Sequence, residues 1–365
     1  MFSRHNTLRG ALLISLLLML GGCFTGAGVP ADTTAPDTVI DPAPVQNAEI
    51  SESEPPGGVS EILIDPNAAA HPLSIASLRQ RAFEGSDLII EETLEPGSNY
   101  HRYIASYLSD GLKIYALLTV PFDARPPTGH PVVIFNHGYI PPTEYRTTER
   151  YVAYVDAFAR NGYIVLKSDY RGHGSSEGEP EGAYGSPAYV IDVLNALASI
   201  RRYPDADPER VGMWGHSMGG YISLRAMVAD QGIRAGVIWA GVVASYPEMF
   251  RSWFVSGPTP PRPGWRSALI EQQGSPDENP AFWNVLSANA FLRDLTGPVQ
   301  IHHGTGDTTV PYMYSTMLDE EIRAAGGVSE LFLYEGDDHN VAANRDDALT
   351  LSVVFFHRHV RGGLE

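Results

Sequence analysis

The sequence predicts an α/β domain built on a mainly parallel, twisted sheet with helices on both faces. Three observations carry this prediction. Short, wholly apolar runs recur after Pro131, as in strands buried on both faces of a sheet. They alternate with helical stretches, which is typical of parallel strands joined by crossover helices. No internal repeat is visible in the 365 residues, which excludes solenoids and propellers.

The folded part of the chain begins with antiparallel signals. Residues 74–83 are compatible with a short helix, and three strand-like runs follow it. They span residues 88–94, 100–108 and 112–120. Asp110-Gly111 separates the last two runs, and Asp-Gly between apolar stretches is a strong hairpin signal. The sheet is therefore expected to open with an antiparallel hairpin.

The parallel part of the sheet is predicted from the apolar runs that follow. These strands are expected at residues 132–135, 163–167, 211–214, 235–239, 299–302 and 330–334. Helices are expected at residues 150–160, 187–200, 218–229, 312–325 and 348–360. Gly162, just beyond the first of these helices, is a typical helix stop.

One long stretch, residues 244–291, interrupts the alternation. It is rich in Pro and Gly and holds three of the five Trp, namely Trp253, Trp265 and Trp283. A compact domain seldom carries so long a loop without a purpose, and ligands of open α/β sheets bind at the carboxyl ends of the strands. We predict an inserted cap that walls a pocket. The alternative is a structural excursion whose Trp side chains only pack.

The N-terminal residues have the pattern of an export signal. Two Arg precede an apolar run at residues 11–20, which is short for a membrane span. Residues 20–23, Leu-Gly-Gly-Cys, resemble the bacterial lipobox, in which the Cys becomes lipidated. We therefore expect residues 1–22 to be a signal peptide and Cys23 the lipid attachment site of a membrane-anchored protein facing the periplasm or the cell exterior. An ordinary signal peptide or an uncleaved anchor is the alternative.

The composition separates a tether from a folded domain and limits the partners. Residues 23–72 are expected to be a disordered tether, because their first part is rich in Pro, Ala, Thr and acidic residues, and residues 73–365 are expected to be the folded domain. The net charge of −18, or −20 without the two Arg of the signal, argues against nucleic acid as a partner. The single Cys excludes an internal disulfide and a Cys-based zinc site.

A candidate nucleophile lies where a strand gives way to a helix. Residues 215–219, Gly-His-Ser-Met-Gly, follow the strand expected at residues 211–214 and open the next helix. This is the context of the Gly-x-Ser-x-Gly elbow, whose sharp turn exposes the Ser hydroxyl at the top of the sheet. Ser217 is the predicted nucleophile, and the helix N-terminus behind it can supply N–H groups to an oxyanion.

A serine nucleophile needs a histidine base and a carboxylate that orients it. In this fold class the chain order is Ser, then acid, then His. Asp307 follows one buried strand and His339 follows the next, so both are expected at the same edge of the sheet. Asp307 is the predicted acid and His339 the predicted base, with Asp338 as the alternative acid.

The other histidines have less suitable positions. His216 lies inside the elbow, too close to Ser217 to act as its base, and His173 comes too early in the chain. His302 and His303 end a strand and are expected, one or both, to be structural.

The oxyanion donors are expected from two loops. In this fold the loop after the strand at residues 132–135 supplies one backbone N–H. That loop contains Tyr139, which could donate through its N–H or its phenol. The N–H of Met218, directly after the nucleophile, is the expected second donor.

Several motifs together resemble a known superfamily. They are residues 109–114 (Ser-Asp-Gly-Leu-Lys-Ile), residues 136–138 (Asn-His-Gly), residues 169–176 (Asp-Tyr-Arg-Gly-His-Gly-Ser-Ser), the elbow, the Asp307 loop and His339. Residues 88–360 resemble the α/β-hydrolase superfamily, above all the catalytic domain of the prolyl-oligopeptidase-like serine peptidases and their small esterase relatives. The resemblance implies that residues 169–176 shape one side of the pocket; we interpret them as a Gly-rich turn pinned by Asp169 and Arg171. No metal or organic cofactor is implied.

Two departures from the peptidases argue against peptidase activity. The segment before the hairpin is too short for a propeller, and the loop at residues 137–139 is His-Gly-Tyr instead of His-Gly-Gly. The sequence thus favours a carboxylesterase-like serine hydrolase acting on a small ester. The alternatives are a serine peptidase acting on short peptides and a non-catalytic binding lipoprotein on the same fold.

Overall fold

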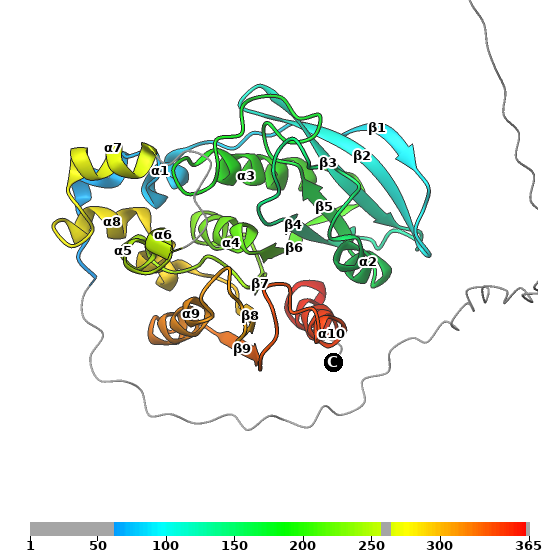
Figure 1. Cartoon of the computed structure of the whole chain (residues 1–365). Helices are drawn as coiled ribbons and strands as arrows, with labels where there is room; N and C mark the ends of the chain where they lie inside the picture. Colours follow the sequence, from blue (N-terminus) through cyan, green and yellow to red (C-terminus); the bar gives the residue numbers. More distant parts are fainter. Residues whose placement is uncertain (1–61, 257–263, 363–365) are drawn as a thin grey trace, which may run out of the picture. The chain divides into compact units, whose positions relative to one another are not determined.

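A nine-stranded mixed sheet forms the centre of the computed structural model, which describes residues 62–256 and 264–362 (Figure 1). The strands are β1 (Ile89–Leu94), β2 (Tyr100–Ser109), β3 (Leu112–Pro121), β4 (His130–Asn136), β5 (Ile164–Ser168), β6 (Ala206–His216), β7 (Ala235–Trp239), β8 (Val299–Gly304) and β9 (Ser329–Tyr334). Their order across the sheet is β1-β2-β3-β5-β4-β6-β7-β8-β9. The strands from β5 to β9 pair in parallel, whereas β1, β2 and β3 are antiparallel. The predicted fold class, the α/β-hydrolase fold, is confirmed.

The hairpin between β2 and β3 is built as the sequence predicts. Ser109 pairs with Leu112, and the two residues between them have positive φ angles, 54° at Asp110 and 80° at Gly111. A two-residue turn with both φ angles positive matches the twist of the strands that it joins. This hairpin extends the parallel sheet on one side.

Helices cover both faces of the sheet. They are α1 (Ile75–Gln80), α2 (Val152–Arg160), α3 (Ala188–Ile200), α4 (Met218–Ala229), α9 (Met313–Ala324) and α10 (Arg345–Phe356), after which His357–Gly362 continues as a π-helix. Successive side chains of a strand point to opposite faces, so the apolar strands contribute side chains to two hydrophobic cores, one on each face of the sheet. In β4, Val132 and Ile134 belong to the core under α1, α3, α4 and α9, whereas Val133 and Phe135 belong to the core under α2 and α10.

The predicted cap is a group of short helices between β7 and β8. They are α5 (Tyr246–Arg251), α6 (Trp253–Ser256), α7 (Gly264–Gln273) and α8 (Pro280–Leu286), followed by a 3₁₀ segment at Ala288–Asp294. In Figure 1, α5, α6, α7 and α8 lie together beside α4, at the side of the molecule away from the hairpin. Residues 257–263, within the predicted cap, lie outside the described residues.

The end of the predicted tether differs from expectation. Residues 62–72 are described, and Pro66–Ala70 forms a 3₁₀ turn in which Ala68 is buried. The Asp65 N–H donates to the carbonyl oxygen of Ala281 at 3.2 Å, so the segment is attached to α8. Residues 62–72, which the sequence assigns to the tether, therefore lie on the folded domain, and the Leu63 carbonyl also accepts from the Asn284 side chain at 3.1 Å. The reason is apolar contact, since the Ala-rich turn covers part of the core.

The predicted signal peptide, Cys23 and the tether up to residue 61 lie outside the described residues. Among the residues that are described, no helix is long and apolar enough to cross a membrane.

Candidate active site

Ser217 lies at a strained turn between β6 and α4. Its backbone φ is 54° and ψ is −117°, an unfavourable region for a residue with a Cβ atom. Backbone hydrogen bonds hold this conformation: the Ser217 N–H donates to the Trp239 carbonyl at 2.9 Å, and the Ser217 carbonyl accepts from the N–H groups of Gly220 at 3.0 Å and Val242 at 3.2 Å, among others. The turn therefore has the backbone strain expected of a nucleophile elbow.

The glycines of the elbow are required by close backbone approach. A Cβ atom on Gly215 would overlap the carbonyl of Gly219 and the side chain of Ser223. A Cβ atom on Gly219 would overlap the carbonyl of Asn136 at the end of β4. Glycine at both positions thus lets the start of α4 lie directly against the loop after β4.

Asp307 and His339 meet at the carboxyl edge of the sheet. Asp307 follows β8, His339 follows β9, and the Nδ1 atom of His339 lies 2.6 Å from Oδ2 of Asp307. The other carboxylate oxygen, Oδ1, accepts the N–H groups of Thr309 at 2.7 Å and Val310 at 3.0 Å. These contacts fix the carboxylate so that its second oxygen faces the imidazole.

The charge of Asp307 is strongly stabilised. Burial raises the pKa of its carboxyl group, but hydrogen bonds from His303 and His339 outweigh burial and hold the pKa well below its ordinary value. The group is therefore ionised at neutral pH, as a residue must be to stabilise an imidazolium.

Asp338, the alternative acid, is engaged elsewhere. Its Oδ1 accepts the N–H groups of Asn340 at 2.9 Å and Ala342 at 3.0 Å, which closes the loop behind His339. Only Asp307 bonds the imidazole of His339 among the described residues. The geometry favours Asp307 as the acid.

His303 makes a contact that the sequence did not assign. Its Nε2 atom lies 2.9 Å from the same Oδ2 of Asp307, and its Nδ1 atom lies 2.6 Å from Oγ of Ser315. Its neighbour His302 points elsewhere, to Tyr334 and Gln300. The spacing of four residues between His303 and Asp307, in a loop that follows a strand, is the signal that could have suggested this contact.

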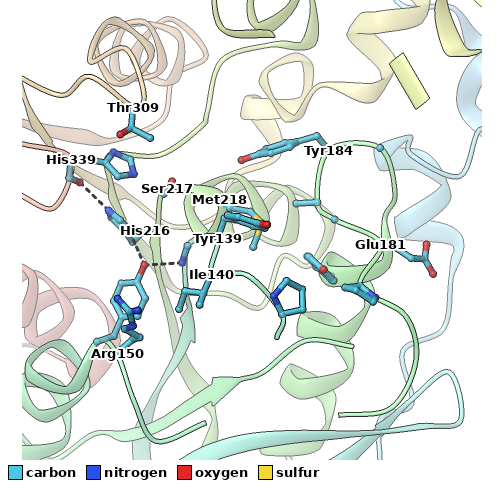
Figure 2. A pocket seen from close by; sticks show the side chains of 18 of the residues that line it. Tyr139, Ile140, Arg150, Glu181, Tyr184, His216, Ser217, Met218, Thr309 and His339 are labelled. Carbon is cyan, nitrogen blue, oxygen red and sulfur yellow. Dashed lines mark hydrogen bonds between the residues drawn. The ribbon is translucent and has the colours of Figure 1, made fainter. Parts of the chain in front are cut away.

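Ser217 and His339 border one cavity of about 660 Å³, which Figure 2 shows from close by. No hydrogen bond joins Ser217 Oγ to His339 in this structure, and such bonds often tighten only when substrate is bound. The structure thus brings Ser217 and His339 to one cavity, with Asp307 bonded to the imidazole behind it.

The two expected oxyanion donors lie at the same cavity. Tyr139 and Met218 both line it, and neither backbone N–H donates to an acceptor among the described residues. The Gly138 N–H, in contrast, donates to the hydroxyl of Tyr151 at 3.0 Å. The Tyr139 side chain is 54% exposed at the cavity mouth. Free N–H groups are what an oxyanion site needs.

Known proteins share this architecture. A family model described as serine aminopeptidase, S33, matches residues 128–265. The uncharacterized peptidase YtmA of Bacillus subtilis (strain 168) is 23% identical over 259 residues, which is 69% of this chain and 92% of that protein. Thiohydrolase aneE of Aspergillus aculeatus and dipeptidyl peptidase 8 of Homo sapiens are each matched over only 25% of their own length.

Solved structures agree on the fold. Pyrococcus horikoshii acylaminoacyl peptidase has a TM-score of 0.59 at 20% identity, over 73% of this chain and 43% of that chain. Acetyl xylan esterase 1 from Thermoanaerobacterium sp. JW/SL YS485 has a TM-score of 0.59 at 16% identity, over 80% of this chain and 98% of that chain. This chain is a serine hydrolase. The matched proteins include both peptidases and esterases, so they do not identify the bond that this hydrolase cleaves.

The cavity of the hydrolase has aromatic walls from the cap. Trp253 and Trp265 line it together with Tyr184, whereas Trp283 is fully buried away from it. The Nε1 atom of Trp253 donates to the carbonyl of Thr309 at 2.8 Å, so the cap rests on the acid loop. Two of the three Trp residues thus form the expected pocket wall, and the third packs in the core.

The Gly-rich run at residues 169–176 has a structural role in the hydrolase, as interpreted from the sequence. Asp169 accepts hydrogen bonds from the hydroxyls of Tyr145 at 2.9 Å and Thr147 at 2.6 Å. Arg171 forms an ion pair with Asp192 at 2.7 Å. Residues 169–176 are not among the residues that line the cavity, so these contacts fix the turn and do not form the pocket wall that the resemblance implies.

Proposed function

We propose that this hydrolase cleaves carboxylic esters through an acyl-enzyme on Ser217. The observation that carries the proposal is the Asp307–His339 pair, held at 2.6 Å beside an aromatic-walled cavity that Ser217 also borders. Apolar walls favour an apolar acyl or leaving group, because contact with aromatic surface removes it from water.

The chemistry follows the order of an acyl transfer. Ser217 Oγ attacks the ester carbonyl while His339 Nε2 takes its proton, and Asp307 holds Nδ1 and stabilises the imidazolium. The N–H groups of Tyr139 and Met218 bind the oxyanion. His339 then protonates the leaving alkoxide, and a water molecule, activated by the same histidine, releases the acid.

A serine peptidase acting on short peptides is the second candidate. It is supported by two names: the matched family model is described as a serine aminopeptidase, and the Bacillus subtilis relative is named a peptidase. The same side chains would serve amide hydrolysis, with His339 protonating a leaving amine. The third hypothesis, a non-catalytic binding lipoprotein, is not retained because the chain is a serine hydrolase.

Parallel assays separate the two candidates. We expect the wild-type protein to be labelled by a fluorophosphonate and to turn over p-nitrophenyl acyl esters with a higher kcat/KM than aminoacyl or acylaminoacyl naphthylamides. Higher kcat/KM on the naphthylamides would instead support the peptidase. Absence of labelling would contradict both, since both need an activated serine.

Whether Tyr139 donates to the oxyanion through its backbone N–H or its phenol is testable. Tyr139→Phe removes the phenol and keeps the backbone N–H, so we expect kcat/KM on the best ester to stay within about threefold of wild type. If the phenol were the donor, kcat/KM would fall by roughly 10²-fold or more. Initial rates at low substrate concentration distinguish the two results.

We also propose that the protein is a lipid-anchored lipoprotein outside the cytoplasm, attached through Cys23. The support is the lipobox-like sequence at residues 20–23 and the position of the single Cys there. Cys23→Ser should move the enzyme from the membrane fraction to the soluble fraction after cell breakage, and it should abolish incorporation of labelled palmitate. Unchanged fractionation would contradict the anchor.

A further inference from the structure

A chain of hydrogen bonds, the Tyr151–His216 bridge, runs beside the nucleophile along the wall of the same cavity. The Gly138 N–H donates to the Tyr151 hydroxyl at 3.0 Å, that hydroxyl lies 2.7 Å from Nδ1 of His216, and Nε2 of His216 lies 2.9 Å from the carbonyl oxygen of His339. Figure 2 draws the three bonds as dashed lines beside Ser217.

The bridge has only one consistent arrangement of protons. The His339 carbonyl can only accept, so Nε2 of His216 carries the hydrogen and Nδ1 of the neutral ring accepts from Tyr151. The Tyr151 hydroxyl then donates to His216 and accepts from Gly138. Burial, with a contribution from His339, lowers the pKa of His216 to about 3, so the ring stays neutral near pH 7.

The bridge joins three segments that must lie together for acyl transfer: the loop that holds Gly138, the elbow and the loop that holds His339. Gly138 directly precedes Tyr139, a proposed oxyanion donor. His216 directly precedes Ser217, and the carbonyl that it holds belongs to His339. The bridge thus connects the oxyanion loop, the elbow and the base loop without contacting the reacting carbonyl in the proposed mechanism.

The backbone around the bridge is strained in a way that only tight contacts sustain. Arg150 and Tyr151 have successive positive φ angles of 58° and 53°, and Val341, two residues after the base, has a φ of 51°. Left-handed conformations of such residues persist only where surrounding contacts fix them. A Cβ atom on Gly138 would lie 2.8 Å from the Tyr151 hydroxyl, so the approach of that loop is close. Three residues after Tyr151, in α2, the hydroxyl of Tyr154 donates to the Asn340 carbonyl at 3.2 Å.

We propose that Tyr151 and His216 are positioning residues, which hold the oxyanion donor and the base in register with Ser217. The proposal rests on the proposed acyl-enzyme mechanism. Gly138, Tyr151 and His216 also line the cavity, so the informative change is one that removes the hydroxyl and keeps the ring, as Tyr151→Phe does. Loss of the hydroxyl should lower the rate of acylation with little change in substrate binding, because misplacement of catalytic groups by about 1 Å is enough to lower the rate about 100-fold.

The test compares Tyr151→Phe with Tyr163→Phe. Tyr163 also has a buried hydroxyl, but that hydroxyl has no hydrogen-bond partner among the described residues, so its removal controls for loss of a buried oxygen. For Tyr151→Phe we expect kcat on a p-nitrophenyl ester and the rate constant of fluorophosphonate labelling to fall together by roughly 10- to 100-fold, with KM within about threefold. Tyr163→Phe should match wild type in kcat, in KM and in the rate constant of labelling.

The double variant separates positioning from a general loss of structure. His216→Gln keeps an N–H for the His339 carbonyl but breaks the link to Tyr151. If the two residues act through one bridge, the double variant should be no slower than the slower single variant, because coupled residues are not additive. Tyr151→Phe at the wild-type rate, or losses that multiply in the double variant, would overturn the proposal.

The readout also separates this inference from the proposed function. Fluorophosphonate reacts with an activated serine whether the natural substrate is an ester or a peptide. If wild type is not labelled, the acyl-enzyme mechanism itself fails. If wild type is labelled and Tyr151→Phe is labelled equally fast, only the positioning role fails.

Discussion

Replacement of Ser217 by Ala is expected to lower kcat for a p-nitrophenyl acyl ester by roughly 10⁴- to 10⁶-fold, with little change in KM. The Ser217 hydroxyl is the atom that would form the acyl-enzyme, and no other group can take its place at the same point of the elbow. The N–H groups of Tyr139 and Met218 remain, so a small residual rate above the uncatalysed reaction should persist.

Loss of the fold would not explain this result. Ala keeps the Cβ atom of Ser217, and the backbone hydrogen bonds that hold its strained φ of 54° involve no side-chain atom. The melting temperature should therefore change little. Ser98→Ala is the matched control, because Ser98 is exposed in the loop between β1 and β2. Wild-type turnover by Ser217→Ala would exclude Ser217 as the nucleophile.

The sequence predicted the sheet well where strands are apolar and less well where they are polar. The strand expected at residues 211–214 is in fact β6, which begins at Ala206 and includes charged residues. These residues carry no apolar signal; they join the strand because Ala206 pairs with His130 of β4. Similarly, α10 begins at Arg345, three residues earlier than expected, because Asp346 and Asp347 in its first turn favour a helix N-terminus through charge rather than burial.

The site shows the same division between local and long-range information. Ser217 is predictable because its motif lies within five residues and between a strand and a helix. Asp307 and His339 follow from the chain order of the fold and from the convergence of strand ends. Tyr151 was not assigned, because its contact forms only when separate segments meet: it lies 65 residues from His216 in the chain. His303 lies only four residues before Asp307, but His302 beside it also ends the strand, so the sequence does not tell which of the two faces the carboxylate. Local sequence patterns do not specify such partners.

Replacement of Asp307 by Asn should lower kcat by roughly 10³- to 10⁴-fold, whereas Asp338→Asn should stay within about threefold of wild type. The Oδ2 atom of Asp307 accepts from Nδ1 of His339, so it fixes the ring with Nε2 free to take the proton of Ser217. An amide N–H at this point would favour the opposite tautomer, and the negative charge that stabilises the imidazolium would be lost. Asp338 serves only backbone N–H groups of its own loop.

Asp307→Asn should also change the pH dependence of stability. The pKa of Asp307 is lowered in the folded state, so its charge stabilises the fold above its unfolded value of about 4, and this contribution is lost as the pH falls through the folded value. Urea unfolding should therefore find Asp307→Asn less stable than wild type at pH 7, with a difference in the free energy of unfolding that narrows below about pH 4.

A low kcat for Asp338→Asn beside a nearly wild-type kcat for Asp307→Asn would reverse the assignment of the acid. Equal, small losses in both would mean that neither carboxylate orients His339, and the proposed proton path would have to be abandoned.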